Sequence, residues 1–255
     1  MRISRSTAGT AFVGGALILT LSALAYPSML GVQNAASGQD RIIANTQWGP
    51  LTEADRDFVV RVRAAGLWEY PLGQMAMTKG TTPAMKEVAK HLLVGHGRLD
   101  ASCRKLGTDL GITLPNEPSP QQQQFVATAE GATGKEFDST AVTIMRVAHG
   151  AIFPTVAKIR ATTRNSLVRE LADQTNDTVL DHITILEKTG LVNHEQVAFQ
   201  ITAPAKLPQD QTTPPPPQAG APVRVLPVPE DLKDFQTVAP NPSFAAQPQP
   251  APSAG

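Results

Sequence analysis

The stretch from residue 82 to residue 110 constrains the fold of this 255-residue chain more than any other part of it. Thr82 and Pro83 are residue types that begin helices, and Gly111 is the type that follows a helix end. Between them lie apolar positions spaced alternately by four and three residues, the period of a helix packed in a bundle: Met85, Ala89, Leu92, Leu99, Cys103, Leu106 and Leu110. One position of this stripe is His96, a residue type that an apolar core does not need.

Three further stretches have the same amphipathic pattern. They run from residue 53 to 79, from 133 to about 163, and from 165 or 166 to just before Gly190. Four such helices of about 25–30 residues, joined by two tight connections and one long one, predict an all-α four-helix bundle. The sequence therefore indicates one folded domain, residues 52–195, with a short helical piece in the long connection.

Each predicted helix carries one ionisable residue on or beside its apolar stripe: Glu69, His96, His149 and His182. Counted from the two tight turns at about 1.5 Å per residue, these positions match in height within roughly 3–5 Å. Three imidazoles and one carboxylate suit a single Zn²⁺, Mn²⁺, Fe or Cu ion, and bundles build such sites from facing helices. The alternative is a hydrogen-bonded polar cluster that fixes the helix register without an ion. Asp138 is expected as an N-terminal helix residue or as a group that supports a ligand.

The other candidate side chains are expected to be structural or solvated. His91 and His194 lie off the apolar stripes and are predicted to face water, and Asp181 and Glu187 are predicted to be surface charges. Cys103 is the only cysteine, so it forms no internal disulfide, and its place on the stripe favours core packing over reactivity.

The first part of the chain predicts export. Residues 1–32 begin with Arg2 and Arg5 and continue with an uncharged, mostly apolar run over residues 8–32. This pattern is a signal peptide or, since the run is long enough to span a bilayer, an uncleaved membrane anchor. Basic residues before the run place the rest of the chain outside the cytoplasm in either case.

Two segments outside the bundle are expected to be extended. Residues 33–51 are interpreted as a polar linker. Residues 200–255 are rich in proline, glutamine and alanine, which predicts a disordered tail. That tail is either a spacer in the cell envelope or a docking peptide for a proline-recognising partner. With 22 basic and 22 acidic residues and no basic run, the chain has no signature of nucleic-acid binding.

The run from Gly66 to Ala76 (GLWEYPLGQMA), together with His96, His149 and His182 in their segments, resembles the domain of unknown function family 4142. The match extends over about residues 51–191. The resemblance implies an exported bacterial protein with a ferritin-like bundle, a glutamate on the first helix and histidines on later helices.

The residues that the resemblance marks are Glu69, His96, Asp138, His149 and His182. Ferritin-like proteins that oxidise metal resemble a plan with two Glu-x-x-His motifs and two further glutamates. Here Leu93 and Val179 stand three residues before His96 and His182. A single metal ion, or none, fits this chain better than a two-iron centre.

Three functions are therefore compatible with the sequence. The leading hypothesis is an exported, envelope or stress-related helical module that binds one metal ion. The alternatives are a small metalloenzyme acting on oxygen species and a metal-free envelope scaffold or interaction protein. The sequence contains nothing that resembles a phosphate loop, a nucleophile elbow or a cysteine-pair zinc motif.

Overall fold

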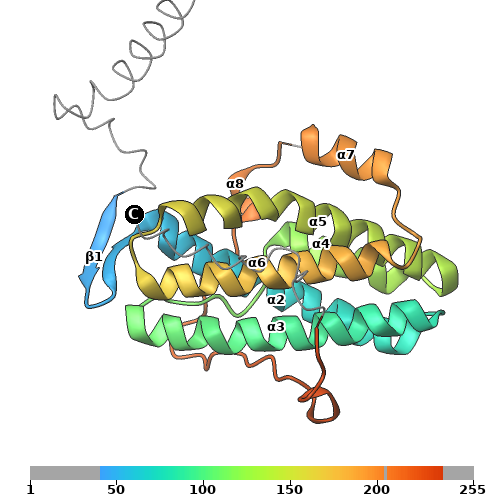
Figure 1. Ribbon diagram of the computed structural model, residues 1–255, viewed down its shortest axis with the longest axis horizontal. Helices are drawn as coiled ribbons and strands as arrows, with labels where there is room; N and C mark the ends of the chain where they lie inside the picture. The colour runs from blue at the N-terminus through green and yellow to red at the C-terminus, as the bar shows by residue number, and fades with distance from the viewer. Residues whose placement is uncertain (1–40, 204–205, 238–255) are drawn as a thin grey trace, which may run out of the picture. The chain divides into compact units, whose positions relative to one another are not determined.

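The computed structural model describes residues 41–203 and 206–237 (Figure 1). The predicted leader, residues 1–32, lies outside the described residues. So do the first part of the predicted linker and the last part of the predicted tail.

Four long helices form the bundle: α2 (Glu53–Lys79), α3 (Pro83–Leu110), α5 (Gly134–Thr162) and α6 (Ser166–Glu187). Helix α2 packs against α3, α3 against α6, α6 against α5, and α5 against α2, so the helices surround a shared core. The prediction of an all-α bundle is confirmed.

The helix limits follow from local capping. Thr52 Oγ1 accepts a hydrogen bond from Asp55 N at 3.2 Å, and Asp55 Oδ2 accepts one from Thr52 N at 2.9 Å. This reciprocal pair satisfies backbone groups that the first turn of α2 leaves free. Thr82 and Asn165 cap α3 and α6 with their side chains, which accept hydrogen bonds from backbone N–H groups of the first turn. Gly111, with φ of 66°, ends α3 in the left-handed conformation that glycine adopts without strain.

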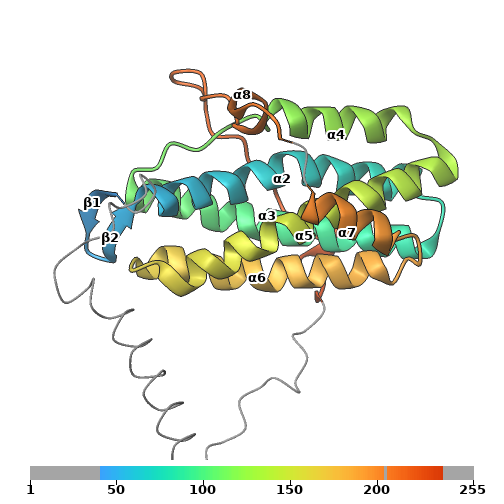
Figure 2. The same ribbon diagram turned by 90° about the horizontal axis from the view of Figure 1, so that it is seen from above.

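The connection from α3 to α5 returns the chain along the bundle, so that α5 begins beside the α2–α3 turn. It contains α4 (Pro120–Gly131), which packs along α2 and α5 (Figure 2). At the turn, Thr81 donates to the Asp138 carboxylate from its N–H at 3.2 Å and from its hydroxyl at 2.5 Å. Among the described residues, Asp138 bonds to none of the four predicted ligands. It anchors the start of α5 through Thr81, which agrees with the first of its two expected roles, an N-terminal helix residue.

Residues 42–52 form a hairpin rather than the end of a linker. Strands β1 (Ile42–Thr46) and β2 (Gly49–Thr52) pair antiparallel, with Thr46 opposite Gly49. Ser166 N donates to the carbonyl of Trp48 at 2.8 Å, and the Asn165 amide donates to that of Gly49 at 3.2 Å. These bonds hold the hairpin against the α5–α6 turn, which local sequence could not indicate.

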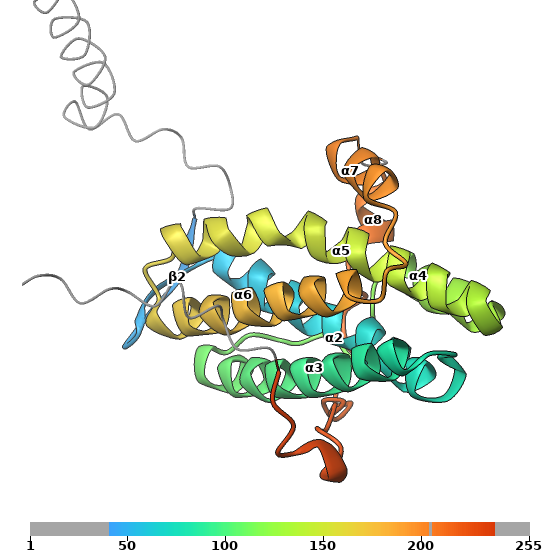
Figure 3. The ribbon, with the colours of Figure 1, turned by 45° about the vertical axis from the view of Figure 1, so that its right-hand side comes forward.

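The chain beyond α6 is partly ordered against the bundle. It contains α7 (His194–Thr202), α8 (Gln209–Thr212) and the short 3-10 helix η2 (Glu230–Leu232). Residues 222–235, which we call the strap, run along the outer side of α3 and α2 (Figure 3). The predicted disorder after residue 200 is therefore wrong for the described part of the tail. The reason is the buried apolar side chains of Leu226 and Leu232 within a proline-rich segment.

Of the described residues, α5 alone has the length and apolar composition to cross a bilayer. Its inner face, with Phe137 and Met145, is buried in the bundle core. On its outer face, α7 lies so close that a methyl group at Gly150 would come within 2.3 Å of Ile201 Cδ1.

Candidate metal centre

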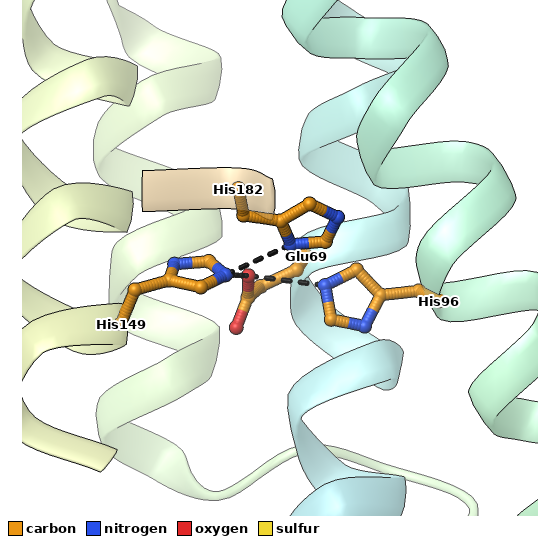
Figure 4. A group of neighbouring side chains, drawn as sticks. All are labelled: Glu69, His96, His149 and His182. Atoms are coloured by element: carbon orange, nitrogen blue, oxygen red, sulfur yellow. Dashed lines mark hydrogen bonds and ion pairs between the residues drawn. The ribbon is translucent and has the colours of Figure 1, made fainter. Parts of the chain in front are cut away.

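One side chain from each long helix points to a common centre (Figure 4). Glu69 comes from α2, His96 from α3, His149 from α5 and His182 from α6. One ligand atom of each residue lies within 4.8 Å of the other three, and none of the four residues is more than 4% exposed. The structure thus brings together the four residues that helix period and height singled out.

The Glu69 carboxylate lies within hydrogen-bonding distance of two of the histidines. Glu69 Oε2 lies 3.1 Å from His96 Nε2 and 3.2 Å from His149 Nε2. The third histidine approaches from the other side, with His182 Nδ1 2.9 Å from His149 Nε2. Three nitrogens and one carboxylate oxygen therefore face the same small volume.

The hydrogen bonds of the outer nitrogens show which tautomer the neutral rings of His149 and His182 adopt. His149 Nδ1 lies 2.7 Å from the carbonyl of Met145, and His182 Nε2 lies 3.1 Å from the carbonyl of His91. A carbonyl only accepts, so both of these nitrogens carry hydrogen. In the neutral rings, His149 Nε2 and His182 Nδ1 are then both lone pairs, and they face each other at 2.9 Å. Such a contact needs a cation between the two nitrogens, either a proton or a metal ion.

The outer nitrogen of His96 differs. His96 Nδ1 is buried and has no hydrogen-bond partner among the described residues. The orientation of the His96 ring therefore depends on the contact with Glu69 and on packing.

The electrostatics favour an ionised glutamate beside a neutral histidine. Burial alone would raise the pKa of Glu69, but His149 and His96 outweigh it and hold that pKa below its ordinary value. Burial, reinforced by His149 and His96, lowers the pKa of His182 well below its ordinary value. A carboxylate and a neutral imidazole are the forms that bind metal ions.

Glycine on α3 makes the close approach of α6 feasible. A methyl group at Gly95 would lie 2.6 Å from His182 Nε2 and 2.9 Å from Thr178 Cγ2. Only glycine leaves room for the His182 ring to reach both the carbonyl of His91 and the centre of the bundle.

The arrangement fits one metal ion. Tetrahedral zinc with bonds of about 2.0–2.1 Å places its ligand atoms roughly 3.3 Å apart. The three contacts measured here are 2.9–3.2 Å, so small side-chain rotations would admit an ion. The group contains one carboxylate, which matches a single ion rather than a carboxylate-bridged pair.

Sequence reasoning missed a second buried pair beside the centre. His91 and Asp181, predicted to face water, are only 3% and 4% exposed, with His91 Nδ1 2.8 Å from Asp181 Oδ2. Phe235 of the strap stands edge-on to the His91 ring at 5.0 Å and covers it. The position of Asp181 directly before His182 was the one sequence signal for this pair. His194 and Glu187 are exposed as predicted.

Cys103 is fully buried, and burial raises the pKa of its thiol to about 12. The predicted core role is confirmed, because a thiol in this environment is neither ionised nor accessible at neutral pH.

The family model described as "Domain of unknown function (DUF4142)" matches residues 43–188, more than half of the chain. No curated protein and no solved structure matches the chain. The family match covers α2, α3, α4, α5 and α6 in full, so it includes all four residues of the candidate centre. The chain belongs to this family of domains of unknown function.

Proposed function

We propose that this protein is an exported module that holds one divalent transition-metal ion, with Glu69, His96, His149 and His182 as ligands. The observation that carries the proposal is the pair of facing lone pairs on His149 Nε2 and His182 Nδ1, 2.9 Å apart. Zn²⁺, Mn²⁺, Fe²⁺ and Cu²⁺ all accept imidazole nitrogen together with carboxylate oxygen.

A proton is the competing cation, and the surroundings of His182 disfavour it. A proton shared by His149 and His182 would place an imidazolium in the core, whereas burial lowers the pKa of His182. A metal ion satisfies both lone pairs and offsets the charge of Glu69. When bound, it would supply a positive centre that cross-links all four helices.

The ligand count favours holding a metal over catalysis. Four protein ligands complete the coordination of a tetrahedral ion, as in structural sites, whereas catalytic zinc keeps a position for water or substrate. A metalloenzyme acting on oxygen species would need such an open position. All four side chains here are buried.

Export is supported by the basic residues Arg2 and Arg5 before the apolar run over residues 8–32. We infer that the bundle acts in the cell envelope, tethered by this run or released from it. A reporter enzyme active only outside the cytoplasm, fused after residue 255, should be active. A reporter without activity in intact cells would contradict export.

Metal analysis of the full chain tests the binding proposal. The protein is purified without chelator or a nickel column, offered each of the four ions in turn, and analysed for bound metal. We expect one tightly bound ion per chain in the natural protein and none in His149→Ala or His182→Ala. His194→Ala is the matched control, because His194 is an exposed histidine on α7, and it should keep the ion.

The same samples give a second measurement through stability. At a free-ion concentration of 100 times the Kd, binding adds about 2.7 kcal/mol to the free energy of unfolding. A melting temperature that no ion raises and no chelator lowers, in a protein that retains no metal, would refute the proposal. It would leave the hydrogen-bonded polar cluster as the explanation of the four residues.

A further inference from the structure

We propose that the strap controls exchange of the metal ion, with Leu226 closing the centre on the side of His96. The inference rests on the proposed function, because it concerns the same site. It assigns the strap a role in retaining the ion. It also makes His96 the ligand whose ring turns away to let the ion leave.

Leu226 and His96 both lie next to Gly66 of α2. A methyl group at Gly66 would lie 3.1 Å from Leu226 Cδ1 and 3.8 Å from His96 Nδ1. Leu226 is 2% exposed and packs with Tyr70 and Val94. The strap side chain is therefore buried beside Gly66, on the side of α2 where His96 Nδ1 also lies near that glycine.

A second glycine lets the strap lie against α3. A methyl group at Gly97 would come within 2.8 Å of Val228 Cγ2 and 2.9 Å of Val228 N. The strap backbone thus lies directly on the helix, one residue after His96. Larger side chains at residues 66 and 97 would push the strap away and open a path for water.

Among the four ligands, His96 has the ring whose orientation is least restrained by hydrogen bonds outside the centre. The outer nitrogens of His149 and His182 donate to the carbonyls of Met145 and His91, whereas His96 Nδ1 has no partner among the described residues. Ligand histidines are normally oriented by such an outer hydrogen bond. The His96 ring can therefore turn without breaking such a bond, and we infer that Leu226, buried on the other side of Gly66, limits this turning.

Besides the packing of Leu226 and Leu232, the hydrogen bonds between bundle and strap use strap backbone atoms, so the strap can lift without unfolding the bundle. Arg63 donates to the carbonyl of Arg224 at 2.6 Å, Tyr70 Oη donates to that of Pro227 at 2.7 Å, and Leu226 N donates to Asp100 Oδ2 at 3.1 Å. If these bonds open, Arg63 and Asp100 remain paired with each other. Such a segment opens locally at a smaller free energy than global unfolding.

The test compares Leu226→Ala with Val225→Ala in the full chain. Val225 is the neighbouring strap residue and is 53% exposed, so its truncation leaves the cover in place. Each protein is loaded with Zn²⁺, freed of excess ion and mixed with a chelating dye that reports release. We expect Leu226→Ala to release the ion about tenfold faster at unchanged stoichiometry, and Val225→Ala to match the natural protein.

A second measurement needs no metal. Diethylpyrocarbonate acylates accessible imidazole nitrogens, and peptide mapping by mass spectrometry shows which histidines react. In chelated protein, Leu226→Ala should increase the reaction rate of His96, with Val225→Ala unchanged. If the protein binds no ion, the proposed function fails but faster reaction of His96 still supports the strap as its cover.

Tyr70→Phe is the second test variant, to be used if Leu226→Ala does not fold. It removes the bond to Pro227 and keeps the ring, so it should accelerate both release and His96 modification by a smaller factor. Unchanged release and unchanged His96 modification in the folded variants would overturn the inference. Equal acceleration by Val225→Ala would overturn it as well, because the opening would then not involve Leu226.

Discussion

Asp100→Asn should destabilise the protein strongly, because Asp100 is the counter-charge of a buried arginine. The side chains of Arg63 and Asp100 are 0% and 1% exposed and form a direct ion pair beneath the strap. Burial lowers the pKa of Arg63 and the Asp100 carboxylate raises it in part. Asparagine keeps the size of the side chain and one acceptor oxygen. Its amide nitrogen cannot accept the bonds that Leu226 N and Arg104 Nε make to Oδ2, so the substitution removes these bonds together with the charge.

The expected loss follows from what Arg63 retains. Removing one partner of a buried ion pair costs about 3–5 kcal/mol. Arg63 would still donate to the carbonyls of Pro115 at 3.2 Å and Arg224 at 2.6 Å, which favours the lower end. A loss of about 3 kcal/mol is a large part of a typical stability of 5–15 kcal/mol. At about 2–4 °C per kcal/mol, it corresponds to a fall of roughly 6–12 °C in Tm.

Urea unfolding of the chelated full chain, followed by far-UV circular dichroism, measures this loss. Arg104→Gln is the control, because Arg104 donates to the same carboxylate at 2.8 Å but is 34% exposed. It should cost less than about 1 kcal/mol. The double variant Arg63→Met/Asp100→Leu should lose less than Asp100→Asn, since no unpaired charge remains buried. A cost below about 1 kcal/mol for Asp100→Asn, or a double variant less stable than the single one, would refute this account.

Three further predictions concern the centre and the core. Gly95→Ala should weaken metal binding by about 10–100-fold in a competition titration, because the new methyl group displaces His182 from its outer hydrogen bond. Gly131→Ala, with nothing within 4 Å of its new methyl group, should leave affinity unchanged. Stability of the chelated protein should fall as pH drops below the ordinary histidine value of 6.5, because the pKa of His182 is lowered in the fold and the unfolded chain takes up the proton first. Glu69 adds to this below its ordinary pKa of 4.5, since its folded pKa is also lowered. Urea midpoints should therefore stay level between pH 8 and about pH 7 and decline from there to pH 4. Cys103 should resist alkylation in the native protein at pH 8 and react fully in urea, and rapid native labelling would contradict its burial.

The sequence predicted the helices and the four converging residues because both depend on local rules. Thr52, Thr82 and Asn165 cap helices through hydrogen bonds to residues two or three positions away. The rise per residue of an α-helix is constant, so residue counts from a turn translate into heights. Glu69 and His149 could therefore be placed at one level before any tertiary contact was known.

The strap and the His91–Asp181 pair could not be predicted in this way. The bond from Leu226 N to Asp100 joins residues 126 positions apart, and that from Arg63 to the carbonyl of Arg224 joins residues 161 apart. No local period encodes such contacts. His91 looked solvated because its position lies off the α3 stripe, and contacts with two distant residues, Asp181 of α6 and Phe235 of the strap, make that position buried.

The strap also gives a structural reason why α3 has no Glu-x-x-His motif. A Glu-x-x-His motif on α3 would require a glutamate at residue 93, three residues before His96. The chain has Leu93 there, 4% exposed and packed in one apolar cluster with Leu226 and Leu232 of the strap. A carboxylate at this position would be buried among apolar side chains, at a cost of several kcal/mol unless an ion or a hydrogen bond compensated it. Leu93 thus packs under the strap at the position where a Glu-x-x-His motif would place its glutamate, so docking of the strap and a second carboxylate ligand on α3 are alternatives at this residue.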